Sequence, residues 1–298
     1  MNGPAEWIAV DWGTTSLRAW AMRGGEALDS ARSGDGMGAL GPGGFEPALL
    51  RLVGPWLREG ATEVVACGMV GACQGWVEAP YRAVPCAPLG PLPPPLPGTD
   101  PRLSVRILPG LSQLRPHPDV MRGEETQIAG ALERIGDREA VLCLPGTHSK
   151  WVHVSAGEVV SFATFLTGEL FALISERSVL RHSLGGDAWD EEPFLAAVSE
   201  ALSRPEAAFA RLFRLRAEGL LGVPASEPRS TLSGLLIGAE LAAARPWWLG
   251  REVAVIGGAG PARAYAAALA AQGAAPRVLG GEEMARVGLA SARALSHG

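Results

Sequence analysis

Two short turns in the sequence combine the residue types that bind phosphate. Asp11-Trp-Gly-Thr-Thr15 interrupts two apolar stretches, and Gly146-Thr-His-Ser-Lys150 follows a third. Backbone N–H groups in a turn, hydroxyl groups beside them and a nearby cation bind phosphate, and glycine lets the phosphate approach the main chain. Asp11 adds a carboxylate at the end of an expected strand, which suits Mg²⁺ held through coordinated water. Each turn alone has a simpler interpretation, because these residue types also favour ordinary tight turns and strands.

A third turn, within Val253–Arg263, is rich in glycine and lies between an expected strand and an expected helix. It could be a dinucleotide-binding fingerprint, but Arg263 stands where close packing of helix on strand requires Gly or Ala. The turn also comes late in the chain, whereas such a fingerprint opens a long βαβ run. No GxxxxGK[ST] sequence is present, so a nucleotide would have to be bound by another fold.

The elements that position these turns alternate between strands and helices, which favours an α/β fold. Hydrophobic periodicity predicts one hairpin from Trp7–Val10 and Leu17–Met22 and a second from Trp151–Val154 and Val159–Thr164. Further strands are expected at Glu63–Cys67, Ser104–Leu108, Ala140–Leu144, Glu252–Ile256 and Arg277–Leu279. Helices are expected at Gly43–Gly60, Glu124–Ile135, Pro261–Gln272 and Glu282–Leu295, with mostly helical sequence from Gly168 to Arg245.

Length and composition limit the classes of protein. With 298 residues the chain is long enough for two domains, and the prolines that make up eight of the seventeen residues from Pro85 to Pro101 predict an extended loop. The net charge of −5 argues against a nucleic-acid partner. No apolar run approaches the roughly 20 residues that span a bilayer, and the N-terminus lacks a signal-peptide pattern. We therefore expect a cytoplasmic protein with no membrane partner.

The four cysteines, Cys67, Cys73, Cys86 and Cys143, contain no CxxC pair. Together with five scattered histidines they predict reduced thiols and no transition-metal site built from protein ligands alone. Oligomeric state cannot be deduced from these features, and a homodimer stays open.

Several motifs carry a resemblance to known proteins. "DWGTTSLR" resembles the first phosphate motif of the sugar kinase/actin/Hsp70 superfamily, "LPGTHSKW" its second phosphate motif and "VIGGAG" its adenosine motif. "GMVGACQGWVEAPY", "VMRGEETQIAGAL", "TGELFALIS" and "LSGLLIGAEL" are similar to segments of the 2-dehydro-3-deoxygalactonokinase family. The matching segments extend from Asp11 to about Gly260, which is nearly the whole chain.

The resemblance implies two ribonuclease H-like α/β domains with ATP in an interdomain cleft. We place the first domain at residues 1–112. It would carry the first phosphate motif and the segment "GMVGACQGWVEAPY", which is called the sugar-site segment below because the resemblance implies that it contacts the sugar. The second domain, at residues 113–298, would carry the second phosphate motif and the adenosine motif. The implied reaction is transfer of the γ-phosphate of ATP to the C6 hydroxyl of 2-dehydro-3-deoxy-D-galactonate.

The same resemblance assigns the nucleotide side of the site. Asp11 matches the acid that holds Mg²⁺ through water, and Arg18 matches the arginine of the kinase form of the motif. Arg18 could equally be a surface arginine on a strand, and His148 could be a structural turn residue or a phosphate ligand. The cofactor-binding residues implied are Gly13, Thr14, Thr15, Arg18, Gly146, Thr147, Ser149, Lys150, Gly257, Gly258 and Gly260.

The acceptor side is assigned by analogy with related carbohydrate kinases, which carry a Gly-Asp pair before the second phosphate motif. This sequence offers Gly123-Glu124 there, so Glu124 is the expected catalytic base, with Glu125 as the alternative and a helix-capping role as the simpler interpretation. An anionic sugar acid also requires a cation, and we favour Arg122 over Arg82. The remaining candidates for substrate contacts are Gln74, Trp76, Glu78, Thr167 and Glu169, of which Trp76 could instead belong to the core.

Two other functions stay open. A kinase of the same fold could act on another acid, such as 2-dehydro-3-deoxygluconate, or on a neutral sugar. A nucleotide-driven switch resembling actin or Hsp70 is the alternative from another class, although Arg18 and the sugar-site segment argue against it.

Overall fold

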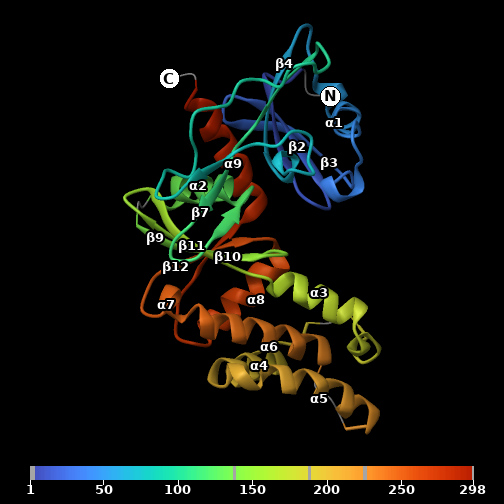
Figure 1. The fold of residues 1–298 in the computed structure, drawn as a ribbon, viewed down its shortest axis with the longest axis vertical. Coiled ribbons are helices and arrows are strands. Elements are labelled where there is room, and N and C mark those ends of the chain that lie inside the picture. Colours follow the sequence, from blue (N-terminus) through green and yellow to red (C-terminus); the bar gives the residue numbers. More distant parts are fainter. Residues whose placement is uncertain (1–3, 137–138, 187–188, 224–226, 297–298) are drawn as a thin grey trace. The chain divides into compact units, whose positions relative to one another are not determined.

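The computed structural model describes residues 4–136, 139–186, 189–223 and 227–296, and two mixed five-stranded sheets organise them (Figure 1). The chain packs into two compact units. The first unit comprises Met1–Glu139, Val154–Ser161 and Gly281–Gly298, and the second comprises Ala140–His153 and Phe162–Gly280.

The first sheet has the strand order β3-β2-β1-β4-β6. Its strands are β1 (Trp7–Trp12), β2 (Leu17–Arg23), β3 (Glu26–Ser33), β4 (Thr62–Gly68) and β6 (Leu103–Ile107). β1, β2 and β3 pair antiparallel, whereas β4 runs parallel to both β1 and β6. This arrangement brings the ends of β1 and β4 to the same edge of the sheet, where Asp11 lies opposite Cys67.

Helices cover both faces of the first sheet, which explains why β1 is apolar on both sides. Ile8, Val10 and Trp12 pack with α1 (Phe45–Val53) on one face. Trp7 and Ala9 pack on the other face with residues of α2 (Glu124–Ile135) and α9 (Gly281–Ala294). The C-terminal helix α9 runs beside α2, as Figure 1 shows. α2 is thereby fixed against the sheet, with its N-terminal end leading into the candidate site.

The second sheet repeats this order as β11-β10-β9-β12-β13. Its strands are β9 (Ala140–Leu144), β10 (Ser149–Ser155), β11 (Glu158–Phe165), β12 (Val253–Gly257) and β13 (Arg277–Gly280). β12 pairs parallel with β9 and with β13, as the equivalent strand β4 does in the first sheet. The turn between β9 and β10 is therefore the counterpart of the turn between β1 and β2.

Helices supply most of the remaining second unit. They are α3 (Thr167–Arg177), α4 (Glu191–Ser203), α5 (Ala208–Leu220), α6 (Pro228–Ala243), α7 (Arg245–Trp248) and α8 (Ala259–Ala270). α4 packs closely along α6 (Figure 1), and residues of both helices form a core with the sheet and α8. α6 is largely buried along its length, and its buried residues include the polar Ser230, Thr231 and Glu240.

Short elements complete the described chain. A three-stranded sheet has the order β5-β7-β8, from β5 (Tyr81–Ala83), β7 (Gly110–Gln113) and β8 (Asp119–Met121). Short 3₁₀ helices occur at Met37–Ala39, Gly54–Trp56, Met69–Gly71, Val179–His182 and Pro205–Ala207. No helix in the described ranges is long and apolar enough to cross a membrane.

The predicted α/β fold with two ribonuclease H-like sheets is confirmed, and α2 has the bounds expected from its periodicity. β3 was not expected, because this edge strand is mostly exposed and shows no apolar alternation. The compact units also differ from the division expected after residue 112. α2 and α9 both belong to the first unit, because they pack against each other and against the first sheet. These contacts join residues that are far apart in the sequence.

Candidate active site

Asp11 lies at the end of β1, where the sheet register places Arg18 directly opposite it on β2. Arg18 Nη1 donates to Asp11 Oδ2 at 3.2 Å, and Cys67 Sγ lies 4.0 Å from Oδ1. Burial raises the pKa of Asp11, and the charge of Arg18 lowers it only in part. Glu282 and Glu124 raise this pKa further. Asp11 is thus a nearly buried carboxylate that a further cation would stabilise.

The turn after β1 exposes the groups expected to bind phosphate. Thr14 and Thr15 are exposed, and the Gly13 N–H donates to the Ser16 carbonyl at 2.9 Å. A second segment, Gly36–Gly38, packs behind this turn, and its Gly38 N–H donates to the Thr14 carbonyl at 2.9 Å. A side chain at Gly36 would collide with the main chain of Thr15. The turn is therefore held from behind while its outer side stays open.

The start of α2 lies against the end of β4, close to Asp11. Gly123 has φ 104° and lies against Gly68, the last residue of β4, which has φ 91°. An added Cβ at Gly68 would lie 2.7 Å from the Trp12 carbonyl oxygen and 3.6 Å from Asp11 Oδ1. Both positions therefore require glycine, because of the positive φ and the close approach. These contacts bring the first residues of α2 to the end of β1.

Glu124 and Glu125, the first two residues of α2, differ in their surroundings. Glu124 is half-buried, and its Oε2 accepts from the backbone N–H of Arg122 at 3.0 Å. Glu125 is fully buried, and its Oε2 accepts from the backbone N–H of Gly123 at 2.7 Å. Burial, and secondly the charge of Glu124, raise the pKa of Glu125 to about 8. Glu125 therefore holds its proton at neutral pH.

Arg122 is a buried cation with unsatisfied donors. It is 9% exposed, its Nη2 donates to the Ala79 carbonyl at 2.8 Å, and its guanidinium carbon lies 4.2 Å from the centroid of the Tyr81 ring. Within the described residues Nε and Nη1 have no hydrogen-bond partner. Its Nη1 also borders Gly71, at the start of the expected sugar-site segment. An anion placed here would complete the hydrogen bonding of the guanidinium.

In the second unit, the loop between β9 and β10 is held by the start of α3. The Glu169 N–H donates to the Thr147 carbonyl at 2.8 Å. An added Cβ at Gly168 would lie 2.1 Å from the Gly146 carbonyl oxygen, so only glycine allows this close approach. Thr147 and His148 are exposed on the loop, and His148 Nε2 lies 2.6 Å from Glu169 Oε2. The loop thus presents its main chain while α3 supports it.

An apolar cavity of about 240 Å³ lies beside this loop within the second unit. It is bordered by Gly146 of the loop, by Gly168 and Phe171 of α3, and by Gly260 and Tyr265 of α8. The volume is below the roughly 300–1,000 Å³ of pockets for drug-sized ligands, so the cavity suits one planar ring better than a whole nucleotide. This cavity, called the apolar slot below, lies next to the turn that is expected to bind phosphate.

Comparisons with known proteins give one consistent result. Residues 11–292 match the family model described as 2-keto-3-deoxy-galactonokinase. A probable 2-dehydro-3-deoxygalactonokinase of Rhizobium meliloti is 40% identical over 305 residues, covering 99% of each chain. The 2-dehydro-3-deoxygalactonokinase of Escherichia coli is 35% identical, covering 96% of this chain and 97% of its own.

The chain belongs to the 2-keto-3-deoxy-galactonokinase family. The predicted family is thereby confirmed, and the chain is a sugar-acid kinase, for which ATP is the implied donor. The crystal structure of a putative 2-dehydro-3-deoxygalactonokinase from Sinorhizobium meliloti is 39% identical, with a TM-score of 0.88 over 97% of this chain and 99% of that one. A dehydratase component from Acidaminococcus fermentans, 12% identical with a TM-score of 0.51 over 96% of each chain, shares the fold alone.

In this member of the 2-keto-3-deoxy-galactonokinase family, several predicted residues occupy other surroundings than those expected. The Ser149 side chain is fully buried and donates to Glu240 at 2.7 Å, and Thr167 also donates to Glu240, so both hydroxyls face the interior. Lys150 is also buried, and since strand side chains alternate, it points to the opposite face from Ser149. Glu169 is paired with His148 on the loop surface.

Some residues of the sugar-site segment are exposed, as expected of ligand-binding residues, and one packs against the core. Gln74 and Glu78 are exposed, so their side chains are available to a ligand. Trp76 packs against the core instead, with its ring 6.5 Å from Phe45 and 6.2 Å from Trp12 between centroids. The interpretation of Trp76 as a core residue is therefore the one that its contacts favour.

Sequence reasoning missed three features that position the site. They are the segment Gly36–Gly38 behind the first turn, Gly168 beneath the second, and the buried Glu240. Only "TGELFALIS" and "LSGLLIGAEL", the segments that contain the last two, gave a signal, and that signal marked the family rather than a role.

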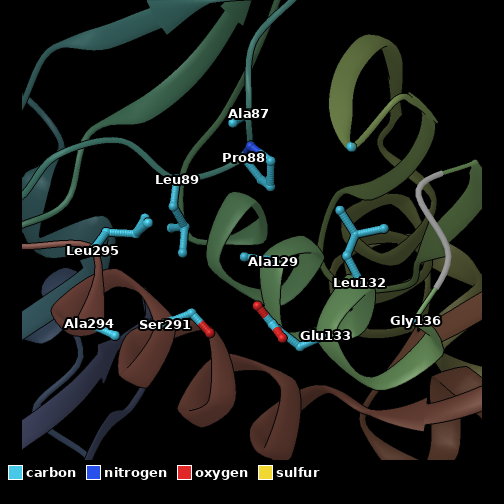
Figure 2. Close-up of a pocket in the computed structure, with 11 residues that line it drawn as sticks. Ala87, Pro88, Leu89, Ala129, Leu132, Glu133, Gly136, Ser291, Ala294 and Leu295 are labelled. Atoms are coloured by element: carbon cyan, nitrogen blue, oxygen red, sulfur yellow. The ribbon is translucent and has the colours of Figure 1, made fainter. Parts of the chain in front are cut away.

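A larger cavity, of about 760 Å³, lies in the first unit between α2, α9 and the proline-rich loop (Figure 2). Leu89, Ala129 and Leu295 give it an apolar lining, and Glu133 and Ser291 bring a carboxylate and a hydroxyl to it. The Ser291 hydroxyl already donates to the Val287 carbonyl at 3.1 Å. None of the residues lining this cavity is a candidate site residue, so its size does not mark the chemistry.

The raised pKa of Glu125 predicts a pH dependence of stability. The unfolded chain loses this proton near the ordinary pKa of 4.5, whereas the folded chain keeps it to about 8. The stabilisation is therefore complete below pH 4.5 and is lost as the pH rises through 8, with a slope of at most about 1.4 kcal/mol per pH unit. We expect Glu125→Gln to flatten the fall of the urea unfolding midpoint between pH 5 and pH 8.

The matched control is Glu26→Gln, which changes an exposed glutamate at the start of β3. This variant should keep the pH dependence of the wild type. An unfolding midpoint that falls equally in the Glu125→Gln variant and the wild type would contradict the assignment.

Proposed function

We propose that the chain transfers the γ-phosphoryl group of ATP to the C6 hydroxyl of 2-dehydro-3-deoxy-D-galactonate, giving the 6-phosphate and ADP. One observation carries the proposal beyond family membership: the half-buried carboxyl group of Glu124 lies two residues from Arg122, a buried cation with unsatisfied donors. A base and an anion-binding group together suit an acceptor that has both a hydroxyl and a carboxylate.

Glu124 is the proposed catalytic base. Its carboxylate would accept the proton of the C6 hydroxyl as the oxygen forms its bond to the γ-phosphorus and the bond from that phosphorus to the bridging oxygen of ADP breaks. Glu125 is unsuited to this step, because it is fully buried and holds a proton at neutral pH. The backbone N–H of Arg122 orients Glu124 by donating to its Oε2.

Arg122 is the proposed ligand of the substrate carboxylate. The two buried nitrogens without partners, Nε and Nη1, can form a paired interaction with carboxylate oxygens. The contacts to Ala79 and Tyr81 hold the guanidinium in place before the substrate binds. Gln74 and Glu78, exposed on the same segment as Ala79, are the proposed ligands of substrate hydroxyls.

The residues around Asp11 fit a Mg²⁺ ion that is shared with the nucleotide. Asp11 offers a hard oxygen ligand, and its raised pKa indicates a charge that the described neighbours compensate only in part. No described group of three or more acids, histidines or cysteines could hold a metal by itself. Asp11 would therefore hold the ion together with phosphate oxygens and water. When bound, the ion would neutralise charge on the transferred phosphoryl group.

The nucleotide would be bound by backbone groups and by the apolar slot of the second unit. Gly146 and Thr147 present the supported main chain of the loop, and Gly13, Thr14 and Thr15 form the corresponding turn of the first unit. Gly257 ends β12, Gly258 is the N-cap of α8 and Gly260 lies in the first turn of α8, whose residues border the 240 Å³ slot. We assign this slot to the adenine ring. A cytoplasmic location is proposed with it, since ATP is supplied there.

The function itself is tested by measuring ADP release by the purified protein with ATP and Mg²⁺. We expect rapid release with 2-dehydro-3-deoxygalactonate and much slower release with 2-dehydro-3-deoxygluconate or a neutral hexose. Preference for the gluconate epimer or for the neutral sugar would identify a kinase with another acceptor. Substantial ATP hydrolysis that no sugar changes would instead favour a nucleotide-driven switch.

Replacement of the proposed base should slow the chemical step. Glu124→Gln removes the proton acceptor but keeps the size of the side chain, so we expect kcat to fall by about 10²–10⁴ while the KM for ATP stays unchanged. Glu125→Gln is the matched control and should retain kcat at pH 7. Full turnover by the Glu124→Gln variant would show that another group is the base.

Replacement of Arg122 should weaken binding of the acid selectively. Loss of a charged hydrogen-bonding partner raises the KM for the sugar acid by about 10- to 100-fold in the Arg122→Met variant, and leaves the KM for ATP unchanged. Arg82→Met is the control, because the Arg82 guanidinium contacts the Pro88 carbonyl, at 3.5 Å. An increase in KM for the acid only in the Arg82→Met variant would reverse the assignment.

A further inference from the structure

Glu240, on α6, is a buried carboxylate surrounded by hydrogen-bond donors. It is 3% exposed. Its Oε2 accepts from Ser149 Oγ at 2.7 Å, from Tyr265 Oη at 2.6 Å and from Thr167 Oγ1. Its Oε1 accepts from Trp151 Nε1 at 2.8 Å. A carboxylate has about four acceptor positions, so these four neutral donors match its capacity.

The donors belong to the elements that form the nucleotide side of the site. Ser149 directly follows the phosphate-binding loop, and Thr167 opens α3, which supports Gly146 from beneath. Tyr265 lies on α8, which begins at Ala259 directly after Gly257 and Gly258, and borders the apolar slot. One side chain thus connects the loop, its supporting helix and the helix beside the slot.

The network does not depend on any donor changing its protonation near neutral pH. Burial, and secondly the charge of Glu240, raise the pKa of Tyr265, so its hydroxyl keeps the proton that it donates. Burial, with the same charge, raises the pKa of Cys143 on β9. The donors to Glu240 therefore stay donors, and the geometry they impose is constant.

Burial excludes a direct role for two members of the network. Ser149 and Trp151 are both fully buried, so their side chains do not reach a bound ligand. Glu240 does not border the apolar slot, although Leu236 and Ile237 of the same helix do. Ser149, Trp151 and Glu240 can therefore influence a bound nucleotide only by fixing the positions of the loop and the helices.

We propose that Glu240 is a positioning residue that fixes the second phosphate loop, the start of α3 and Tyr265 in the geometry that binds ATP. The inference rests on the proposed use of this unit for the nucleotide. Glu240, on α6, would thus align the second phosphate loop with the slot proposed for adenine, although it is distant in sequence from all three elements.

The test is direct ATP binding by the Glu240→Gln variant, measured by calorimetry with ATP and Mg²⁺. The glutamine amide has one acceptor oxygen, and its nitrogen carries two N–H groups. At least one of the four donors to Glu240 would therefore lose its acceptor and face an N–H group instead. We expect the Kd for ATP to rise about tenfold or more, with the KM for the sugar acid unchanged. A Kd equal to that of the wild type would overturn the inference.

Two further variants separate positioning from general stability. Trp248→Phe removes a buried hydrogen bond of the same unit, from Trp248 Nε1 to the Leu241 carbonyl at 2.9 Å, and should leave the Kd for ATP unchanged. An equal loss of ATP binding in this variant would overturn the inference. Glu240→Gln combined with Trp151→Phe removes a donor facing the amide, and should bind ATP more tightly than Glu240→Gln alone.

A milder variant decides the case if Glu240→Gln does not fold. Ser149→Ala removes one fully buried donor and should raise the Kd for ATP about three- to tenfold, whereas an unchanged Kd would overturn the inference. ATP binding by the wild-type protein separates this test from the test of the proposed function. Absence of ATP binding by the wild type would overturn both, while wild-type binding with unaffected variants would overturn the positioning role alone.

Discussion

The high energy of a buried charge is the constraint that organises both candidate sites. Three of the mostly or wholly buried charged groups in the described residues are compensated in different ways. Glu240 is surrounded by neutral donors in sufficient number, and it is structural. Asp11 is paired with one arginine, which offsets its burial only in part. Arg122 keeps two nitrogens without partners among the described residues. Incomplete compensation therefore distinguishes the groups that can bind a cation or an anion from the group that holds the fold together.

The common strand order of the two sheets explains where these groups occur. β1 and β9 are equivalent, so the turn that follows Asp11 corresponds to the loop at Gly146. β4 and β12 are also equivalent, so Gly68, at the start of the sugar-site segment, corresponds to the glycine turn before α8. The proposed ligand sites of each unit thus lie at the ends of two neighbouring parallel strands. In the first unit Asp11 lies at these ends, and Arg122 and Glu124 lie at the start of α2 beside them. In the second unit the ends lead into glycine turns beside an apolar cavity.

Local sequence predicted the elements well, because hairpins, glycine turns and helix periodicity are properties of neighbouring residues. The bounds of α2 and the two phosphate turns could be deduced in this way. β3 could not, since an exposed edge strand needs no apolar alternation. The role of Glu240 was also hidden, because its partners Ser149 and Thr167 are 91 and 73 residues away in sequence. The burial of the Ser149 hydroxyl was hidden too, because the motif does not reveal which way this side chain points.

Helix geometry explains why two adjacent glutamates at the start of α2 have different properties. Successive residues of a helix point about 100° apart, so when Glu125 faces the interior Glu124 is directed toward the open side. Two ionised carboxylates at this point, together with Asp11, would repel one another. Burial removes that repulsion by keeping Glu125 protonated, and the charge of Glu124 itself contributes to this effect. The neutral Glu125 in turn orders the Gly123 turn by accepting its backbone N–H. The proposed choice of Glu124 over Glu125 as the base thus follows from burial, which a Gly-Glu-Glu sequence alone does not encode.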